Sequence, residues 1–397
     1  MGCLKGKMSA VGYSVRVGEG VNASDADILE KLLRNRFSEL DPAKDDRNYS
    51  AGCVVLGEHL NSDFTLPQIY FAGRYIGFTL REDAAKVSGA QLKLYVEKRV
   101  REYAAERSSA GEFGLISRSE LRELKENVRI ELFRKLTPTI RMFDVIFDTE
   151  GGRVWFFGKS KKVREVFFEL FQDIFGVSPV EDNLYSALER ASTPTEADQF
   201  LSLSVLPFGG VWEDLREKSA VSDLSLASKI KRVEWFGPEF LTYLFFRCTE
   251  SASGSLEGVD DVSVSFVDSV SLESVCGDDQ TTLKGTDAGN RPEILTALRE
   301  GQLLTGATLS VLHQDRVWMF SLDAHTFQVS GVKVPSELDE DDDSAEQKII
   351  DRFSLLETLE VILHRLLGVY IRERLSSLAW RSFHNRVHAA VTSVEQE

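Results

Sequence analysis

The chain contains 397 residues, of which 43 % are hydrophobic and 28 % are charged, and its formal net charge is −16. This composition is typical of a soluble globular protein with two or three domains, and no apolar run approaches the roughly 20 residues that span a bilayer. The four cysteines lack any CxxC spacing, which argues against a zinc ribbon and against a disulfide framework. We therefore expect a cytoplasmic protein without membrane contact.

Residues 81–164 reverse the charge of the chain. This window holds 19 lysines and arginines against 13 acids, a net charge of +6, whereas the rest of the chain carries −22. The acidic remainder already supplies solubility, so a basic segment indicates a surface kept for a polyanion.

The N-terminal part alternates strand and helix patterns. Val11 to Val17 has the alternation of a strand, and Ser24 followed by Asp27 predicts the start of a helix. Gln68–Phe71 and Tyr75–Leu80 flank a short turn and predict a hairpin.

Two helices are expected next, over about 90–107 and 117–136, with the small residues 108–111 as the turn between them. Ser117 and Glu120 have the spacing of a capping box, and Pro138 follows the second helix. A second hairpin, Arg141–Asp148 with Arg153–Gly158, then leads into a helix over 160–175.

The C-terminal half predicts a mixture of helices and antiparallel strands. The expected elements are a helix from Gly237 to Phe246, strands at Val262–Val267 and Val270–Val275, a short helix at Pro292–Arg299 capped by Asn290, a three-strand meander (Leu303–His313, Arg316–Leu322, Thr326–Val334), an acidic run at 337–343, and a final helix over about 346–390.

Together these patterns predict an α+β fold with mixed or antiparallel sheets, a protruding helical arm and a C-terminal helix that serves a dimer contact. The expected units are an N-terminal α/β domain (1–87 and 138–189), a basic helical arm (88–137), an insertion (190–234), a second α+β domain with the meander (235–335), an acidic linker (336–345), and a C-terminal helix and tail (346–397).

No motif predicts an enzyme, a cofactor or a metal site. Gly158-Lys159-Ser160 resembles the end of a phosphate loop, but the spacing from Gly152 is wrong for one. Gly18-Glu19-Gly20 lacks the third glycine of a dinucleotide-binding turn. His384 and His388 lack the glutamate of a zinc protease helix and are expected to form a surface pair. The acidic run lacks the glycine of a calcium loop.

The basic residues of the second arm helix form the best candidate site. Arg118, Arg122, Lys125 and Arg129 recur at helical spacing and share one face, apart from the leucine stripe. The full set of candidate DNA-binding residues is Arg118, Arg122, Lys125, Arg129, Arg134, Lys135, Lys159, Lys161, Lys162 and Arg164. The last four surround a helix start, where the helix dipole also favours phosphate. Many exposed helix faces are equally basic, and interleaved glutamates dilute this one, so an acidic protein partner stays an alternative, as does a metal-dependent nuclease.

The order of these elements resembles the RdgC family of bacterial recombination-associated DNA-binding proteins. The segments that carry the resemblance are Ile69–Ile76, Leu132–Pro138, Phe143–Asp148 with Gly151-Gly152, Ser160–Glu165, Gly237–Phe246, Arg299–Thr305, the meander to Val334, and Arg352-Phe353 with the leucines after it.

This resemblance implies a ring-shaped homodimer whose basic inner surface encircles DNA without reading its sequence. It also implies competition with the RecA recombinase for DNA, association with the nucleoid, and no catalysis. Residues 190–234, the acidic linker and the extension beyond about 370 depart from the family pattern.

Overall fold

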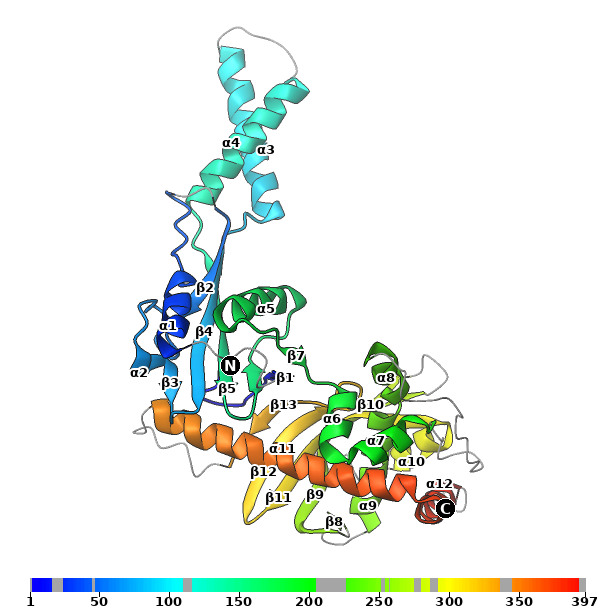
Figure 1. Cartoon of the computed structure of the whole chain (residues 1–397). Coiled ribbons are helices and arrows are strands. Elements are labelled where there is room, and N and C mark those ends of the chain that lie inside the picture. Colours follow the sequence, from blue (N-terminus) through cyan, green and yellow to red (C-terminus); the bar gives the residue numbers. More distant parts are fainter. Residues whose placement is uncertain are drawn as a thin grey trace.

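The computed structural model describes residues 2–15, 24–44, 47–109, 116–204, 226–250, 254–256, 258–274, 280–285, 292–335 and 345–392. Within them it is an α+β fold built on two antiparallel sheets (Figure 1), as the sequence predicts. Several expected features lie outside the described residues: the acidic run, the partial glycine motif at Gly18, the Asn290 cap and most of the turn after Ser109.

The first sheet has the strand order β2-β4-β5-β6-β1-β7, with β3 paired to β4. Its strands are β1 Val11–Ser14, β2 Tyr49–Val54, β3 Tyr70–Phe71, β4 Tyr75–Ala84, β5 Thr139–Asp148, β6 Arg153–Phe156 and β7 Val180–Glu181. Both expected hairpins are therefore confirmed, the first through β3 and β4 and the second through β5 and β6. A single turn, α2 (Leu66–Ile69), precedes β3.

Helices α1 (Asp25–Arg34) and α5 (Lys161–Phe175) cover one face of this sheet. The Ser24 cap is confirmed, since its hydroxyl accepts a hydrogen bond from the Asp27 N–H. Alternation along β5 sends Phe147 toward α5 and the neighbouring Ile146 to the opposite face. Phe156 stacks on Phe167 of α5 with ring centroids 4.2 Å apart, so aromatic side chains fill much of this core.

The helical arm projects from the end of the sheet where β4 stops and β5 begins (Figure 1). It consists of α3 (Gly89–Ser109) and α4 (Arg118–Arg134). The predicted capping box at Ser117 is present: its hydroxyl accepts from the Glu120 N–H, and its own N–H donates to the Glu120 carboxylate at 2.7 Å. Such a box satisfies two amides that have no partner within the helix.

The second sheet has the order β10-β9-β11-β12-β13, with β8 paired to β9. Its strands are β8 Ser255–Leu256, β9 Val259–Ser274, β10 Gln280–Lys284, β11 Gln302–His313, β12 Arg316–Asp323 and β13 Gln328–Lys333. Helices α6 (Leu184–Ala191), α7 (Pro194–Leu201), α8 (Leu226–Val233), α9 (Phe236–Glu250) and α10 (Pro292–Arg299) belong to the same half. The meander β11-β12-β13 is as predicted.

One long helix, α11 (Ala345–Leu375), lies across both halves and is followed by α12 (Ser377–Thr392) (Figure 1). Toward the first sheet, Glu357 of α11 accepts hydrogen bonds from Arg74 and Tyr75, each at 2.9 Å. Toward the second sheet, Arg365 of α11 donates to Asp261 of β9. Most apolar residues of α11 are buried in this chain's own core, while Val361 is 58 % exposed. The buried face is therefore not available for the expected dimer contact, which stays a prediction for the exposed side of the helix.

Two further expectations are corrected. The two strands expected between Val262 and Val275 form one strand, β9, with a bulge at Asp268, where φ is +57°. The single final helix is two helices that meet at Ser376.

The expected insertion at 190–234 stays a prediction. Its described part contributes to the core, because Phe200 and Leu201 of α7 are buried against α11; residues 205–225 lie outside the described residues.

The N-terminal segment is enclosed between the first sheet and α11. The Cys3 N–H donates to Asp144 at 2.8 Å, and the buried Arg352 of α11 donates to the carbonyls of Cys3 and Gly6. Met8 exchanges backbone hydrogen bonds with Val332 of β13. This segment thus contacts β13 and α11, from which it is more than 300 residues away in the sequence.

Cys3, Cys53 and Cys248 should resist alkylation in the native protein. All three are buried, and burial raises the pKa of Cys248 to about 12 and that of Cys53 further, so the reactive thiolate is scarce. We expect their reaction with iodoacetamide to be at least ~100-fold slower than in urea-unfolded protein, since opening must precede reaction. Site-resolved mass spectrometry measures this, and rapid native labelling of any of the three would contradict the described packing.

Candidate nucleic-acid interface

Four cations share one exposed face of α4. Arg118, Arg122, Lys125 and Arg129 are all exposed, and their spacing places them within one side of the helix. Arg118, Arg122 and Lys125 form no ion pair within 4 Å with any residue that the structure describes, while Arg129 lies 3.9 Å from Glu126. Their charges are therefore directed mainly at solvent.

The arm itself holds together through few buried contacts. Tyr103 and Arg107 of α3 each donate to Glu120 of α4 at 3.2 Å, which links the helices near their connection. Val128 is buried between them, whereas Leu94 and Leu121 remain 65 % and 43 % exposed. The two arm helices therefore expose most of their side chains to solvent and do not enclose a hydrophobic core of their own.

Basic residues continue from α4 to the sheet. Arg134 and Lys135 at the helix end and Arg141 on β5 are exposed, and Lys135 pairs with Glu131 at 2.8 Å. Alternation along β5 puts Arg141 on the face that carries Phe143 and, further along, α5. The α4 cations thus extend toward the sheet face that α5 covers.

A second group of cations lies where α5 begins. Lys159, Lys161 and Lys162 are exposed around Ser160, the N-cap residue, whose side chain makes no capping hydrogen bond. The Lys162 ammonium lies 4.5 Å from the centre of the Tyr49 ring, and Tyr49 pairs with Ala84, the last residue of β4 before the arm. The structure therefore brings this group to the arm end of the sheet, beside the Arg141 position.

Arg164 does not belong to this surface. Its guanidinium binds Glu181 of β7 at 2.6 Å, and its side chain is only 28 % exposed. A charge already paired within the fold gains little by contacting phosphate, so this predicted residue is better described as a link between α5 and β7. Sequence spacing could not show this, because Glu181 is 17 residues away.

Lys93 and Arg101 of α3 are exposed cations that the helix-face reasoning did not select. Neither forms an ion pair within 4 Å with another described residue. The charge count over 81–164 includes them, and so the local net charge is the signal that could have identified them. They extend the basic character of the arm to its other helix.

Among the residues that the structure describes, no group of three or more His, Cys, Asp or Glu is arranged so that it could hold a metal ion. The expected surface pair is wrong for His384, which is 1 % exposed, while His388 is partly exposed. His313 bonds the Asp261 carbonyl at 3.1 Å and holds β11 against β9.

No family model matches the sequence, and no curated protein matches it. Among the residues that the structure describes, no helix has the length and apolarity needed to cross a bilayer. The fold and surface thus define an α+β protein with a basic, protruding helical arm.

Proposed function

We propose that this protein binds DNA without sequence preference through the arm and the start of α5. The observation that carries the proposal is the exposed stripe of Arg118, Arg122 and Lys125, which form no ion pair within 4 Å with a described residue. Sequence-independent affinity comes from cations that contact phosphates and release bound counterions.

The acidic remainder of the chain supports the same proposal. Residues outside 81–164 carry a net charge of −22, which repels a polyanion and confines it to the basic surface. The chain offers long, flexible cations on a helix and at a helix start, and these are suited to contacts with the backbone.

The resemblance to the RdgC family extends the proposal to the assembly and its role. In this form of the proposal, two copies form a ring around DNA, associate with the nucleoid in the cytoplasm, and modulate recombination by competing with the RecA recombinase for DNA. The protein would act by occupancy rather than by catalysis.

Fluorescence anisotropy with two unrelated duplexes, titrated from low to high salt, tests the DNA-binding proposal. We expect equal affinities and a log–log salt slope of about −3.6 or steeper, which is about −0.9 for each of the four cations on the α4 face. Absence of binding at low salt, or a tenfold preference for one duplex, would overturn it.

A second candidate function is docking of a protein partner on the arm. The observation that favours it is apolar exposure: Leu94, Tyr95, Leu121 and Ile130 are each 42–65 % exposed, and such side chains are enriched in the centres of protein interfaces when they cluster. A weak salt dependence with a protein ligand, together with no DNA binding, would support this function instead.

A further inference from the structure

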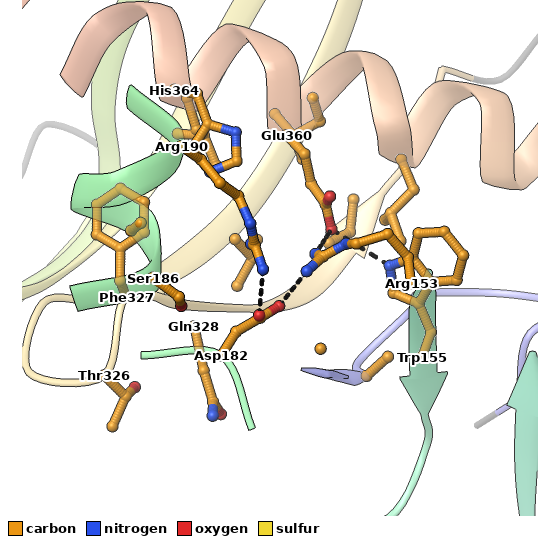
Figure 2. Close-up of a pocket in the computed structure, with 18 of the residues that line it drawn as sticks. Arg153, Trp155, Asp182, Ser186, Arg190, Thr326, Phe327, Gln328, Glu360 and His364 are labelled. Atoms are coloured by element: carbon orange, nitrogen blue, oxygen red, sulfur yellow. Dashed lines mark hydrogen bonds and ion pairs between the residues drawn. The ribbon is translucent and has the colours of Figure 1, made fainter. Parts of the chain in front are cut away.

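A cavity lies at the junction of the two halves, away from the basic arm. It encloses about 90 Å³, room for several water molecules and so for one small ring with a polar substituent. Residues of the N-terminal segment, β6, α6, the β12–β13 turn and α11 line it (Figure 2). Its apolar lining residues include Trp155, Phe327 and Leu363.

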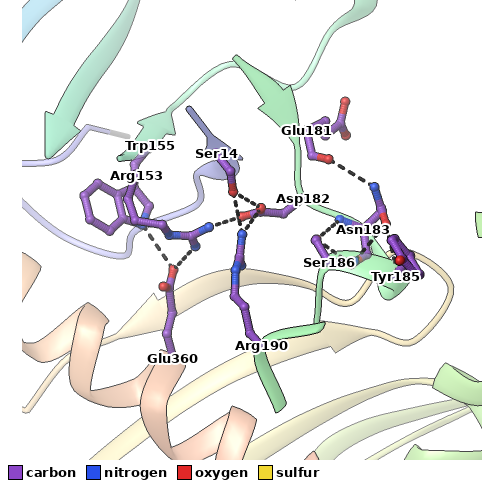
Figure 3. Close-up of polar contacts among 10 residues, drawn as sticks. All are labelled: Ser14, Arg153, Trp155, Glu181, Asp182, Asn183, Tyr185, Ser186, Arg190 and Glu360. Atoms are coloured by element: carbon purple, nitrogen blue, oxygen red, sulfur yellow. Dashed lines mark hydrogen bonds and ion pairs between the residues drawn. The ribbon is translucent and has the colours of Figure 1, made fainter. Parts of the chain in front are cut away.

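The polar side of the cavity is a network of four charges that cancel (Figure 3). Arg153 donates to Asp182 and, at 2.7 Å, to Glu360; Arg190 donates to Asp182 and, at 2.5 Å, to Ser14. Burial opposes the charge on Asp182, but Arg153 and Arg190 outweigh it and lower its pKa. The network is therefore two cations and two anions already paired.

Some hydrogen-bonding capacity in the cavity is unused. Arg190 uses only its Nη2 group in these contacts, and Glu360 accepts through Oε1 alone, from Arg153 and Trp155. His364 also lines the cavity (Figure 2), and burial, aided by the nearby Arg190 and Arg153, lowers its pKa to about 4. At neutral pH this imidazole is uncharged and can both donate and accept.

We propose that this cavity is a binding site for an uncharged small molecule with an apolar ring and one hydrogen-bonding end. The ring would pack on Trp155 and Leu363, and the polar end would meet Arg190, His364 and the free oxygen of Glu360. A charged ligand is disfavoured, because it would add an unpaired charge to a partly buried site whose own charges already cancel. This site does not depend on the proposed DNA binding.

The turn that closes one side of the cavity is consistent with a site. Phe327 has φ +57°, an unusual conformation for a bulky residue. In that position it lies beside Gln328, whose side chain is tied to Glu181 at 2.9 Å. The turn is thus held by a contact from the first sheet, and a ligand in the cavity would touch both halves at once.

Benzamide, benzoate and benzylamine test the proposal, since they share a ring and differ in charge. The readout is the indole N–H resonance of Trp155 in the intact, ¹⁵N-labelled protein, assigned with Trp155→Phe. We expect benzamide to shift it saturably with a Kd on the order of 1 mM, typical of a ligand of about nine non-hydrogen atoms. Both charged compounds should bind at least ~10-fold more weakly.

Variants of the cavity give the matched controls. Ala187→Leu should fill the space and abolish the shift, and Arg190→Met should weaken benzamide at least ~5-fold by removing a donor. Arg34→Met, which breaks an exposed pair with Asp173 elsewhere on the first half, should leave binding unchanged. If Ala187→Leu does not fold, the benzamide affinity of Arg190→Met tests the proposal by itself. No saturable shift with benzamide, charged compounds that bind equally well, or full benzamide affinity in a folded cavity variant would overturn the proposal.

Discussion

Reversing the charge of Arg122, Lys125 and Arg129 together, each to Glu, is expected to weaken DNA binding at least ~100-fold at low salt and to reduce the salt slope by about 2.7. The reason is that three phosphate contacts are lost, each of which contributes about −0.9 to the slope. The loss should be the same for unrelated duplexes, because none of these residues is proposed to read a base. Anisotropy titrations across salt concentrations measure both quantities.

A matched variant separates this local effect from the change in net charge. Lys231, Arg316 and Lys333 are also exposed cations, and they lie in the second half, outside the arm. Changing these three to Glu alters the net charge equally, yet we expect less than a ~5-fold loss of affinity, since long-range effects are screened by salt. If the two triple variants lose affinity equally, the α4 face is not the binding site.

Replacing Arg374 with Met is expected to lower the free energy of unfolding by about 3–5 kcal/mol. The Arg374 side chain is 4 % exposed and lies 2.6 Å from Glu239, which is 0 % exposed. Tyr370 also donates to this carboxylate, at 2.9 Å. The variant leaves the buried Glu239 carboxylate without its guanidinium partner. A fold with one unpaired buried charge is less stable than a fold in which both charges are absent. Urea titration followed by tryptophan fluorescence measures the difference.

Two comparisons identify the cause of this loss. The double variant Glu239→Gln with Arg374→Met removes both charges and should be more stable than Arg374→Met alone. Arg386→Met breaks a pair with Glu250 that is 46 % and 39 % exposed, and should cost less than about 1 kcal/mol. A double variant less stable than the single one would mean that the unpaired Glu239 carboxylate is not the cause of the loss.

The sequence predicts those parts of this fold that depend on near neighbours in the chain. The Ser24 and Ser117 caps, the two hairpins of the first sheet and the meander each follow from residues a few positions apart. The limits of α3 and α4 follow in the same way, from apolar spacing and a capping box. The exposed cation stripe of α4 is also readable from spacing alone.

The remaining features depend on partners that are remote in the sequence. The apolar stripe of α11 shows that the helix has a buried side, but nothing in it shows that both sheets of the same chain cover that side rather than a second copy. Arg164 and His384 likewise have ordinary sequence contexts, and their burial or pairing is set by segments they meet only after folding. The junction cavity is made by five such segments.

The packing of α11 on the first sheet has a consequence for how the protein folds during its synthesis. The strands of the first sheet are all made before residue 182, so that sheet can pair while translation continues. Its second face, with Ile146 and Trp155, is covered only when Phe353 arrives with α11. Until then a nascent chain presents an apolar sheet surface to the ribosome exit region, where chaperones act on exposed apolar segments. The last long helix to be translated therefore closes the part of the molecule that was made first.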